Sequence, residues 1–333
     1  MTKMLQLRKL SGVKNVQMVE TDIPKLEEDE VLVKVTRSLI SRGSELFGRY
    51  IAEQERPDHA MGYSDAGIVV DIGSKIMDIV LGQAMAMGSP HAEYASGKLG
   101  ENGNAFPMPK NMSFETASFL PLVSGAAAWT LIPPMNPGET VVVMGQGLVG
   151  NLCAQAVRQR KPGRVITIDS IKLRCDKSRE CGADEVINIT NTDSVQAVLD
   201  MTNGKGADIV FECVGTAGGG KSFEQALKMV KRDGVVHLIG HIHQGGFYQL
   251  DNSIMNKMVI GGYYKTIGRL ARLNLAAEML MDGRVNIEPL ITHQIPGREA
   301  DKAYHLLYQN PEEALGVVLN LSLIHISEPT RPY

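Results

Sequence analysis

The sequence has few of the features that mark secreted, membrane or nucleic-acid-binding proteins. Its four cysteines form no Cys-x-x-Cys pair, so we expect reduced thiols and neither a disulfide framework nor a zinc cluster. No apolar run is long enough to span a bilayer, and the N-terminal residues lack the apolar core of a signal peptide. The net charge of -3 gives no attraction to nucleic acid or to an acidic membrane. These absences predict a cytoplasmic protein with neither kind of partner.

The remaining composition is ordinary for a globular protein. Hydrophobic residues make up 44% of the 333 residues and charged residues 21%, which allows two domains with separate cores. Aromatic residues are scarce at 5%, whereas there are 17 methionines. We interpret the methionines as core filling rather than as a metal or cofactor device.

The last 13 residues, 321–333, differ from the rest of the chain. They read LSLIHISEPTRPY and follow an apolar strand candidate at 316–320. This peptide resembles the in-frame translation of a transposase sequencing adapter. We therefore expect the natural chain to end near Asn320 and exclude the tail from the fold. The alternative is a genuine C-terminal extension.

The two parts of the chain have different patterns. Up to about residue 120 the pattern indicates strands, with alternation at 30–35 and an apolar run closed by glycine at 66–73. From there to about 264, short apolar runs alternate with helical segments, which predicts a parallel sheet covered by helices. The expected strands lie at 140–144, 164–169, 208–213 and 234–240, and the expected helices at 148–159, 173–181 and 222–231. A further amphipathic helix is expected at 270–281.

A glycine motif follows the strand at 140–144 directly and opens the next helix. It reads Gly145-Gln146-Gly147-Leu148-Val149-Gly150. Glycines at this spacing permit a tight turn, a close approach of the backbone to a pyrophosphate and close packing of helix on strand. The helix N-terminus then presents free N–H groups to the phosphates.

Asp169 ends the second strand, 19 residues after Gly150. An acidic side chain there accepts hydrogen bonds from ribose hydroxyls and repels a 2′-phosphate, which favours NAD over NADP. The alternatives are a flavin or a fold that binds no nucleotide. Positions at the helix start and after the following strands complete the predicted contacts: Gly145, Gly147, Leu148, Val149, Gly150, Asp169, Val214 and Gly240.

Several strings besides the glycine motif resemble the medium-chain dehydrogenase/reductase superfamily over residues 1–320. They include 62–67 (GYSDAG), 136–139 (NPGE), 181–184 (CGAD) and 289–293 (PLITH). The resemblance implies an α/β fold: a doubly wound Rossmann domain at 121–264 and a split, strand-rich, GroES-like catalytic domain at 1–120 and 265–320. Residues 40–45 and 62–64 are similar to the branch containing bacteriochlorophyllide a dehydrogenase.

The same resemblance indicates that the zinc site of many relatives is missing. Zinc-dependent relatives carry C-G-[ST]-[DE] and G-H-E, where this chain has Arg42-Gly43-Ser44-Glu45 and Gly62-Tyr63-Ser64. The third ligand position falls near Leu120. None of these side chains suits Zn²⁺, which takes thiolate, imidazole or carboxylate ligands. We therefore expect no bound metal.

Other groups must then stabilise charge on the substrate oxygen and supply a proton. The candidates are Arg42 as a fixed cation, Tyr63 as the proton donor with its pKa lowered by Arg42, Ser44 as a relay and Glu45 as an orienting acid. Each also has a plainer interpretation, because Arg42 could pair with an acid such as Glu45 and Tyr63 could simply pack. We expect His91 to be structural.

These features together predict a zinc-independent oxidoreductase that moves a hydride between NAD(H) and an alcohol/carbonyl substrate, a small molecule. Two alternatives stay open: reduction of an enone or a quinone, and nucleotide binding without turnover. His237 and His241 flank a strand end near the expected nicotinamide, but we rank them low as catalysts. An apolar edge strand near 259–263 predicts a homodimer.

Overall fold

The computed structural model describes residues 3–53, 60–215, 218–241, 251–261 and 267–322. The chain divides into two compact units. The first unit comprises residues 1–121, 291–310 and 316–333, and the second unit comprises residues 122–290 and 311–315.

The first unit is built on a seven-stranded sheet. Strand order is β14-β15-β3-β4-β5-β7, and β6 pairs with β3. The strands are β3 (Glu30–Leu39), β4 (Asp65–Ile72), β5 (Ala84–Met87), β6 (Tyr94–Lys98), β7 (Ala105–Pro107), β14 (Ile291–Pro296) and β15 (Gly316–Asn320). A separate antiparallel hairpin consists of β1 (Lys3–Lys9) and β2 (Val16–Asp22).

The alternation expected at the start of β3 is present in the burial pattern. Val31, Val33 and Val35 are buried between less buried neighbours. They pack with Met85 and Met87 of β5 and with other apolar residues in one core cluster. The methionines of β5 therefore fill the core, as the composition predicted for methionine in general.

Helical segments of the first unit lie beside this sheet. A wide helical stretch, η1 (Arg42–Tyr50), follows β3 and has π-helical geometry: the N–H of Ile51 donates to the carbonyl of Leu46, five residues earlier. Such geometry is rare and is found frequently at functional sites. The other helices are α1 (Phe114–Ser118), η5 (Gly297–Glu299) and α8 (Ala300–Gln309).

The second unit is a parallel six-stranded sheet with the order β10-β9-β8-β11-β12-β13. Its strands are β8 (Thr140–Met144), β9 (Arg164–Asp169), β10 (Glu185–Asn188), β11 (Ala207–Glu212), β12 (Val230–Leu238) and β13 (Met258–Gly261). The chain leaves β8 in one direction along the sheet and later returns to its other side, which is the doubly wound order. The point of reversal lies between β8 and β11, where the carboxyl ends of parallel strands form a nucleotide site in this architecture.

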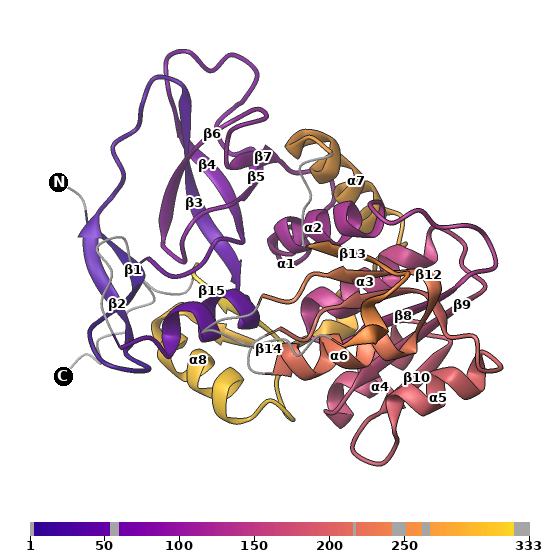
Figure 1. Cartoon of the computed structure of the whole chain (residues 1–333). Helices are drawn as coiled ribbons and strands as arrows, with labels where there is room; N and C mark the ends of the chain where they lie inside the picture. Colours follow the sequence, from indigo (N-terminus) through magenta and orange to yellow (C-terminus); the bar gives the residue numbers. More distant parts are fainter. Residues whose placement is uncertain (1–2, 54–59, 216–217, 242–250, 262–266, 323–333) are drawn as a thin grey trace. The chain divides into compact units, whose positions relative to one another are not determined.

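Helices pack on this sheet (Figure 1). They are α3 (Leu148–Arg158), α4 (Lys172–Glu180), α5 (Ser194–Met201), α6 (Gly219–Met229) and α7 (Arg269–Met281). The short turns η3 (Asn252–Ile254) and η4 (Glu288–Leu290) complete the unit, and α2 (Leu120–Thr130) begins at the division between the units. Val142, Val210 and Val236, from three adjacent strands, are fully buried beneath α6 residues such as Phe223.

The α/β fold class is confirmed, whereas several boundaries differ from expectation. The helix expected to reach residue 231 ends at Met229, because β12 already begins at Val230 to pair with β11. The second domain boundary moves from 265 to 291. The reason is that α7 and η4 pack within the second unit, where the Gln155 side chain bonds the backbone of Asn286 in both directions.

Leu321, the first residue of the adapter-like tail, lies within the described residues. Leu321 is buried at 3% exposure in the core of the first unit, and its N–H donates to the carbonyl of Thr36. Residues 323–333 of the adapter-like peptide lie outside the described residues.

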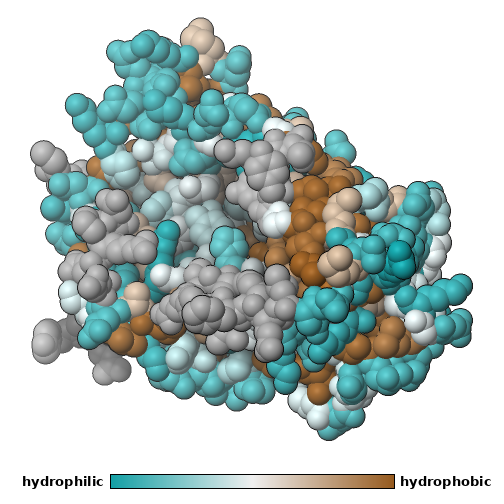
Figure 2. Space-filling view, in the orientation of Figure 1, coloured by the Kyte–Doolittle hydropathy of each residue, from teal (hydrophilic) through white to brown (hydrophobic). Residues whose placement is uncertain are grey.

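The surface is mixed in polarity. In Figure 2 apolar residues gather over part of the second unit, while much of the first unit is hydrophilic. Among the described residues, no helix combines the length and apolar character needed to cross a membrane.

Candidate active site

The glycine motif forms the turn between β8 and α3. Gly145 has a φ of +81°, which other residues rarely adopt. A Cβ on Gly150 would lie 1.7 Å from the carbonyl oxygen of Gly145, so only glycine lets the helix approach the strand this closely. A Cβ on Gly147 would meet nothing within 4 Å. This open space at the start of α3, where Leu148 and Val149 form the first turn, suits the close approach of a pyrophosphate.

Asp169 lies at the end of β9, beside this turn. One carboxylate oxygen accepts from the N–H of Gln146 at 2.6 Å, and the other accepts from the N–H of Ile171 at 2.9 Å. The side chain is 5% exposed. Asp169 therefore joins the glycine turn to the start of α4, at the position from which it would meet an adenosine ribose.

Arg174 was missed in the sequence and lies next to Asp169. Its Nη1 atom is 3.7 Å from the carboxylate, while its Nε and Nη2 atoms are buried without a hydrogen-bond partner among the described residues. Unsatisfied buried guanidinium nitrogens are costly, so they are groups that a ligand could satisfy. The sequence feature that could have identified Arg174 is its position, five residues after Asp169, the predicted ribose-binding acid.

Val214 and Gly240 follow β11 and β12, and both are held by Glu212. The fully buried Glu212 carboxylate accepts from the N–H of Val214 at 2.8 Å and from the Ser222 hydroxyl at 2.6 Å. Its backbone carbonyl accepts from the N–H of Gly240 at 2.9 Å. Burial raises the pKa of this carboxyl group. Glu212, which the sequence analysis did not single out, fixes two of the predicted nucleotide contacts.

In the first unit, two of the predicted catalytic residues meet. The Tyr63 hydroxyl donates to Ser41 Oγ at 2.6 Å and lies 3.4 Å from Ser44 Oγ. Ser44 is exposed, whereas Ser41 is buried. The three hydroxyls form a short path from solvent toward the interior. Ser41 had not been predicted; it precedes the expected motif by one residue.

The Tyr63 phenol has a higher pKa than the sequence suggested. Burial raises it above its usual value, and this outweighs the effect of the hydrogen bonds with Ser41 and Ser44. The expectation that Arg42 would lower this pKa was wrong, because desolvation dominates. Tyr63 is therefore protonated at neutral pH and can act as a proton donor.

Glu45 is the centre of a buried network. Its carboxylate accepts from the backbone N–H of Ser41 at 2.7 Å, from the Tyr304 hydroxyl of α8 and from Nε2 of His91 at 3.1 Å. Although burial alone would raise it, the pKa of Glu45 is lowered, since His91 and these donors stabilise the anion. Glu45 is linked to Tyr63 only through Ser41, and its role as an orienting acid stays a prediction.

The structure places Arg42 at the start of η1. Its Nε atom donates to the backbone carbonyl of Leu307 in α8 at 3.1 Å. Its guanidinium carbon lies 5.1 Å from the centre of the Phe47 ring. Any contact of Arg42 with a substrate oxygen must therefore come from its terminal nitrogens.

The residues present do not fit a zinc ion at the family's metal position. By the family resemblance, two ligand positions hold Arg42 and Tyr63 and the third falls near Leu120, which is a fully buried apolar side chain. Glu45 and His91 nearby have suitable donor atoms, but these atoms bind each other. In the described part of the chain, no three His, Cys, Asp or Glu side chains come together as a metal site.

The remaining histidine candidates have different surroundings. His237 is fully buried in β12, 5.6 Å from the Phe211 ring, and burial lowers its pKa to about 4. It is therefore neutral at pH 7. His241 is exposed just after β12.

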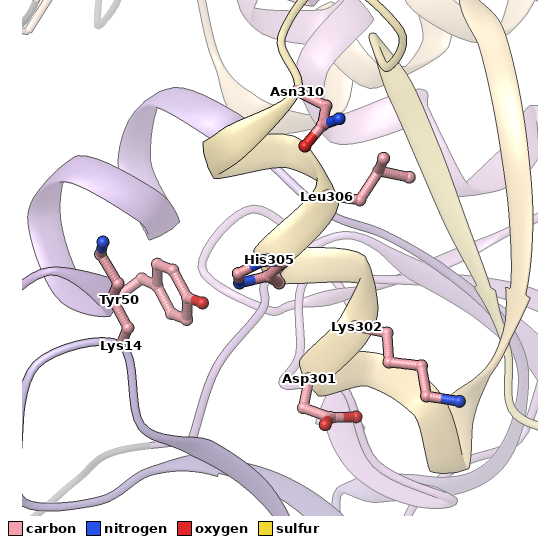
Figure 3. A pocket seen from close by; sticks show the side chains of 7 residues that line it. All are labelled: Lys14, Tyr50, Asp301, Lys302, His305, Leu306 and Asn310. Atoms are coloured by element: carbon pink, nitrogen blue, oxygen red, sulfur yellow. The ribbon is translucent and has the colours of Figure 1, made fainter.

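A separate hollow of about 370 Å³ lies in the first unit (Figure 3). Its lining residues are Lys14, Tyr50, Asp301, Lys302, His305, Leu306 and Asn310. The Tyr50 ring lies 5.5 Å from the Tyr304 ring, so the wall of the hollow touches the residue that donates to Glu45. None of the predicted catalytic residues lines it.

Comparison with known proteins identifies the kind of protein to which this chain is similar. Residues 149–269 match the family described as zinc-binding dehydrogenase. L-threonine 3-dehydrogenase from Pyrococcus furiosus is 27% identical over 342 residues, covering 92% of this chain and 95% of that protein.

Solved structures agree in fold over nearly the whole chain. An oxidoreductase/dehydrogenase of unknown specificity from Escherichia coli, described as involved in membrane biogenesis, superposes with a TM-score of 0.85 at 20% identity, covering 96% of this chain and 99% of that one. A protein described as a zinc-binding dehydrogenase from Sinorhizobium meliloti, bound to NADP, has a TM-score of 0.82 at 22% identity and coverage of 96% and 100%. The placement near bacteriochlorophyllide a dehydrogenase stays a prediction.

Proposed function

We propose that the chain is an oxidoreductase of the medium-chain, alcohol-dehydrogenase type and that it transfers a hydride between NAD(H) and an alcohol or carbonyl substrate without a catalytic zinc ion. The similarity to dehydrogenases over nearly the whole chain supports the first part of this proposal. The observation that carries this proposal is the Tyr63 hydroxyl at the position of a zinc ligand, within 2.6 Å of Ser41 Oγ and 3.4 Å of Ser44 Oγ. We propose that this hydroxyl supplies the proton, at a position where zinc-dependent relatives carry a metal ligand.

In the proposed chemistry, the glycine turn after β8 would hold the nicotinamide cofactor, which would supply the hydride. Tyr63 would give its hydroxyl proton to the substrate carbonyl oxygen when the carbonyl is reduced. The exposed Ser44 hydroxyl then returns a proton from water to Tyr63. In alcohol oxidation the same path runs in the opposite direction.

Asp169 supports NAD as the cofactor. A carboxylate at the end of β9 accepts hydrogen bonds from ribose hydroxyls and repels a 2′-phosphate. Arg174 acts in the other direction, because its buried nitrogens would attract a phosphate. The backbone donors of Gln146 and Ile171 keep the Asp169 carboxylate in place, so we propose that the acid decides the preference.

The test begins with a substrate panel and the parent protein. Consumption or formation of NADH and NADPH is followed at 340 nm with L-threonine, polyols, simple alcohols, aldehydes, ketones, enones and quinones. We expect turnover of an alcohol/carbonyl pair with NAD(H). Turnover of enones or quinones alone would replace the proposal by C=C or quinone reduction, and nucleotide binding with no turnover would replace it by a binding role.

The proton-donor role is tested with Tyr63→Phe. General acid catalysis is worth about 10² to 10⁴ in rate, so kcat should fall by that factor while the Kd for NADH stays unchanged. Ser44→Ala should have a smaller effect, because water can replace an exposed hydroxyl. A normal rate for Tyr63→Phe would remove the role. Elemental analysis showing about one zinc per chain, with activity lost on chelation and restored by zinc, would contradict zinc independence.

A further inference from the structure

His91 lies between the two segments that carry the proposed proton path. Its side chain is fully buried. Nδ1 lies 2.5 Å from Ser38 Oγ on β3, and Nε2 lies 3.1 Å from the Glu45 carboxylate on η1. Both nitrogens therefore have a partner, so the ring is held in one orientation.

One face of His91 supports the turn that carries Tyr63. A Cβ on Gly62 would lie 2.6 Å from ring atoms of His91, so the backbone next to Tyr63 rests directly on the imidazole. Gly62 has a φ of +99°, which also favours glycine there. In addition, the backbone N–H of His91 donates to the carbonyl of Met61 at 2.7 Å. The position of the Tyr63 turn thus depends on His91.

Through Nε2, His91 also contacts the segment that carries Ser41. His91 binds one oxygen of the Glu45 carboxylate, and the second oxygen accepts the backbone N–H of Ser41 at 2.7 Å. Ser41 Oγ in turn accepts from the Tyr63 hydroxyl. The contacts close a ring that runs from Gly62 through His91, Glu45 and Ser41 to Tyr63.

We infer that His91 is a positioning residue that sets the contact between the Tyr63 hydroxyl and Ser41 by joining the two segments on which they lie. This inference rests on the proposed function, since it assigns His91 to the proton path of Tyr63. A displacement of about 1 Å at a reacting group can cost about 10² in rate. We therefore expect the loss of His91 to lower the catalytic rate. The burial of the residue alone would not predict this effect.

Two substitutions of His91 differ in the hydrogen bonds that they remove. His91→Gln keeps an N–H donor near the Nε2 position, so it can still bind Glu45. His91→Leu removes every hydrogen bond of the side chain. Met85→Ala is the matched control, because Met85 is fully buried in the core of the same unit but belongs to the apolar cluster. All three are made in the full chain and compared by thermal unfolding and by NADH binding.

The readouts are kcat and KM with the most active substrate of the panel, and the Kd for NADH. We expect His91→Leu to lower kcat about 10- to 100-fold with little change in NADH affinity, and His91→Gln to recover most of the loss. Met85→Ala should lower the melting temperature and leave the kcat of the folded enzyme unchanged. If His91→Leu behaves like Met85→Ala, the residue is merely structural and the inference is wrong.

A double-mutant cycle separates this inference from the proposed function. If His91 acts through Tyr63, adding His91→Leu to Tyr63→Phe should cost little further activity. Full additivity would overturn the positioning role while leaving Tyr63 as the proton donor. A normal rate for Tyr63→Phe alone would overturn the proposed function instead.

A spectroscopic measurement needs no substrate. The difference absorbance of the parent against Tyr63→Phe reports ionisation of the Tyr63 phenol, whose charged neighbours are Glu45 and Arg49. His91→Leu should release Tyr63 from its buried position and lower its pKa toward the usual tyrosine value. An unchanged titration would show that the Tyr63 turn holds without His91.

Discussion

Two buried carboxyl groups of the first unit have opposite pKa shifts, and we expect opposite effects when each is replaced by its amide. Glu45 accepts from three different groups, and its pKa is lowered. Asp65 is also fully buried, but among the described residues its carboxyl oxygens contact only the Ser89 hydroxyl, at 2.9 and 3.0 Å. Burial raises the pKa of Asp65 well above its usual value.

The expected change in stability for each substitution follows from the number of hydrogen-bond donors around the carboxyl group. In Glu45→Gln an NH₂ group replaces an oxygen, so it faces donors such as the Tyr304 hydroxyl and His91 Nε2. Breaking a buried charged network costs about 3–5 kcal/mol, which corresponds to a decrease in melting temperature of roughly 6–20 °C for a unit of this size. In Asp65→Asn the amide resembles the neutral carboxyl form, which burial favours at Asp65, so we expect a change within about 1 kcal/mol.

The pH dependence has a definite sign for each group. Because the pKa of Glu45 is lowered on folding, its stabilisation is complete above the unfolded-state value near 4.3 and is lost as pH falls below it. The raised pKa of Asp65 has the opposite effect: stability falls as pH rises above about 4, because ionisation favours the unfolded chain. Asp65→Asn should remove this decrease.

The assay is calorimetric unfolding of the full chain without nucleotide, between pH 4 and 8. Ser89→Ala serves as a control, since it removes the Asp65 donor without touching Glu45. If Asp65→Asn is more destabilising at pH 7 than Glu45→Gln, then counting donors does not explain the two carboxyl groups and the reasoning is wrong.

Three further predictions concern the second unit. Gly150→Ala should abolish NADH binding measured by fluorescence, because its Cβ would lie 1.7 Å from the carbonyl oxygen of Gly145; retained binding would show that the turn can relax. Asp169→Ser should reduce the preference for NAD over NADP by at least about tenfold in kcat/KM. Arg174→Ser, which removes a positive charge instead of a negative one, is the matched control. A parent protein that prefers NADP would refute the assignment. We propose a homodimer through the edge strand β13, in which Met258 is 52% and Val259 37% exposed. Light scattering should then show that Val259→Lys is a monomer. A parent protein that is monomeric at micromolar concentration would exclude the dimer. Gly262 and Tyr263 of the expected edge strand lie outside the described residues.

Local signals in the sequence determined the nucleotide-binding half. Strands buried on both faces read as continuous apolar runs, so β8 and β9 were predicted with their observed bounds. The glycine motif and Asp169 are also local, because a turn and the acid after the next strand depend on few neighbours. Their placement beside one another follows from the parallel pairing of β8 and β9.

Only the tertiary structure decided how the catalytic half is organised. Glu45 meets His91, 46 residues away, and Tyr304, 259 residues away, and no local pattern encodes such distant pairs. The same holds for the raised pKa of Tyr63, since burial depends on every segment that packs around it. His91, expected to be structural, acquired its proposed role because folding brings both Gly62 and Glu45 into contact with its ring.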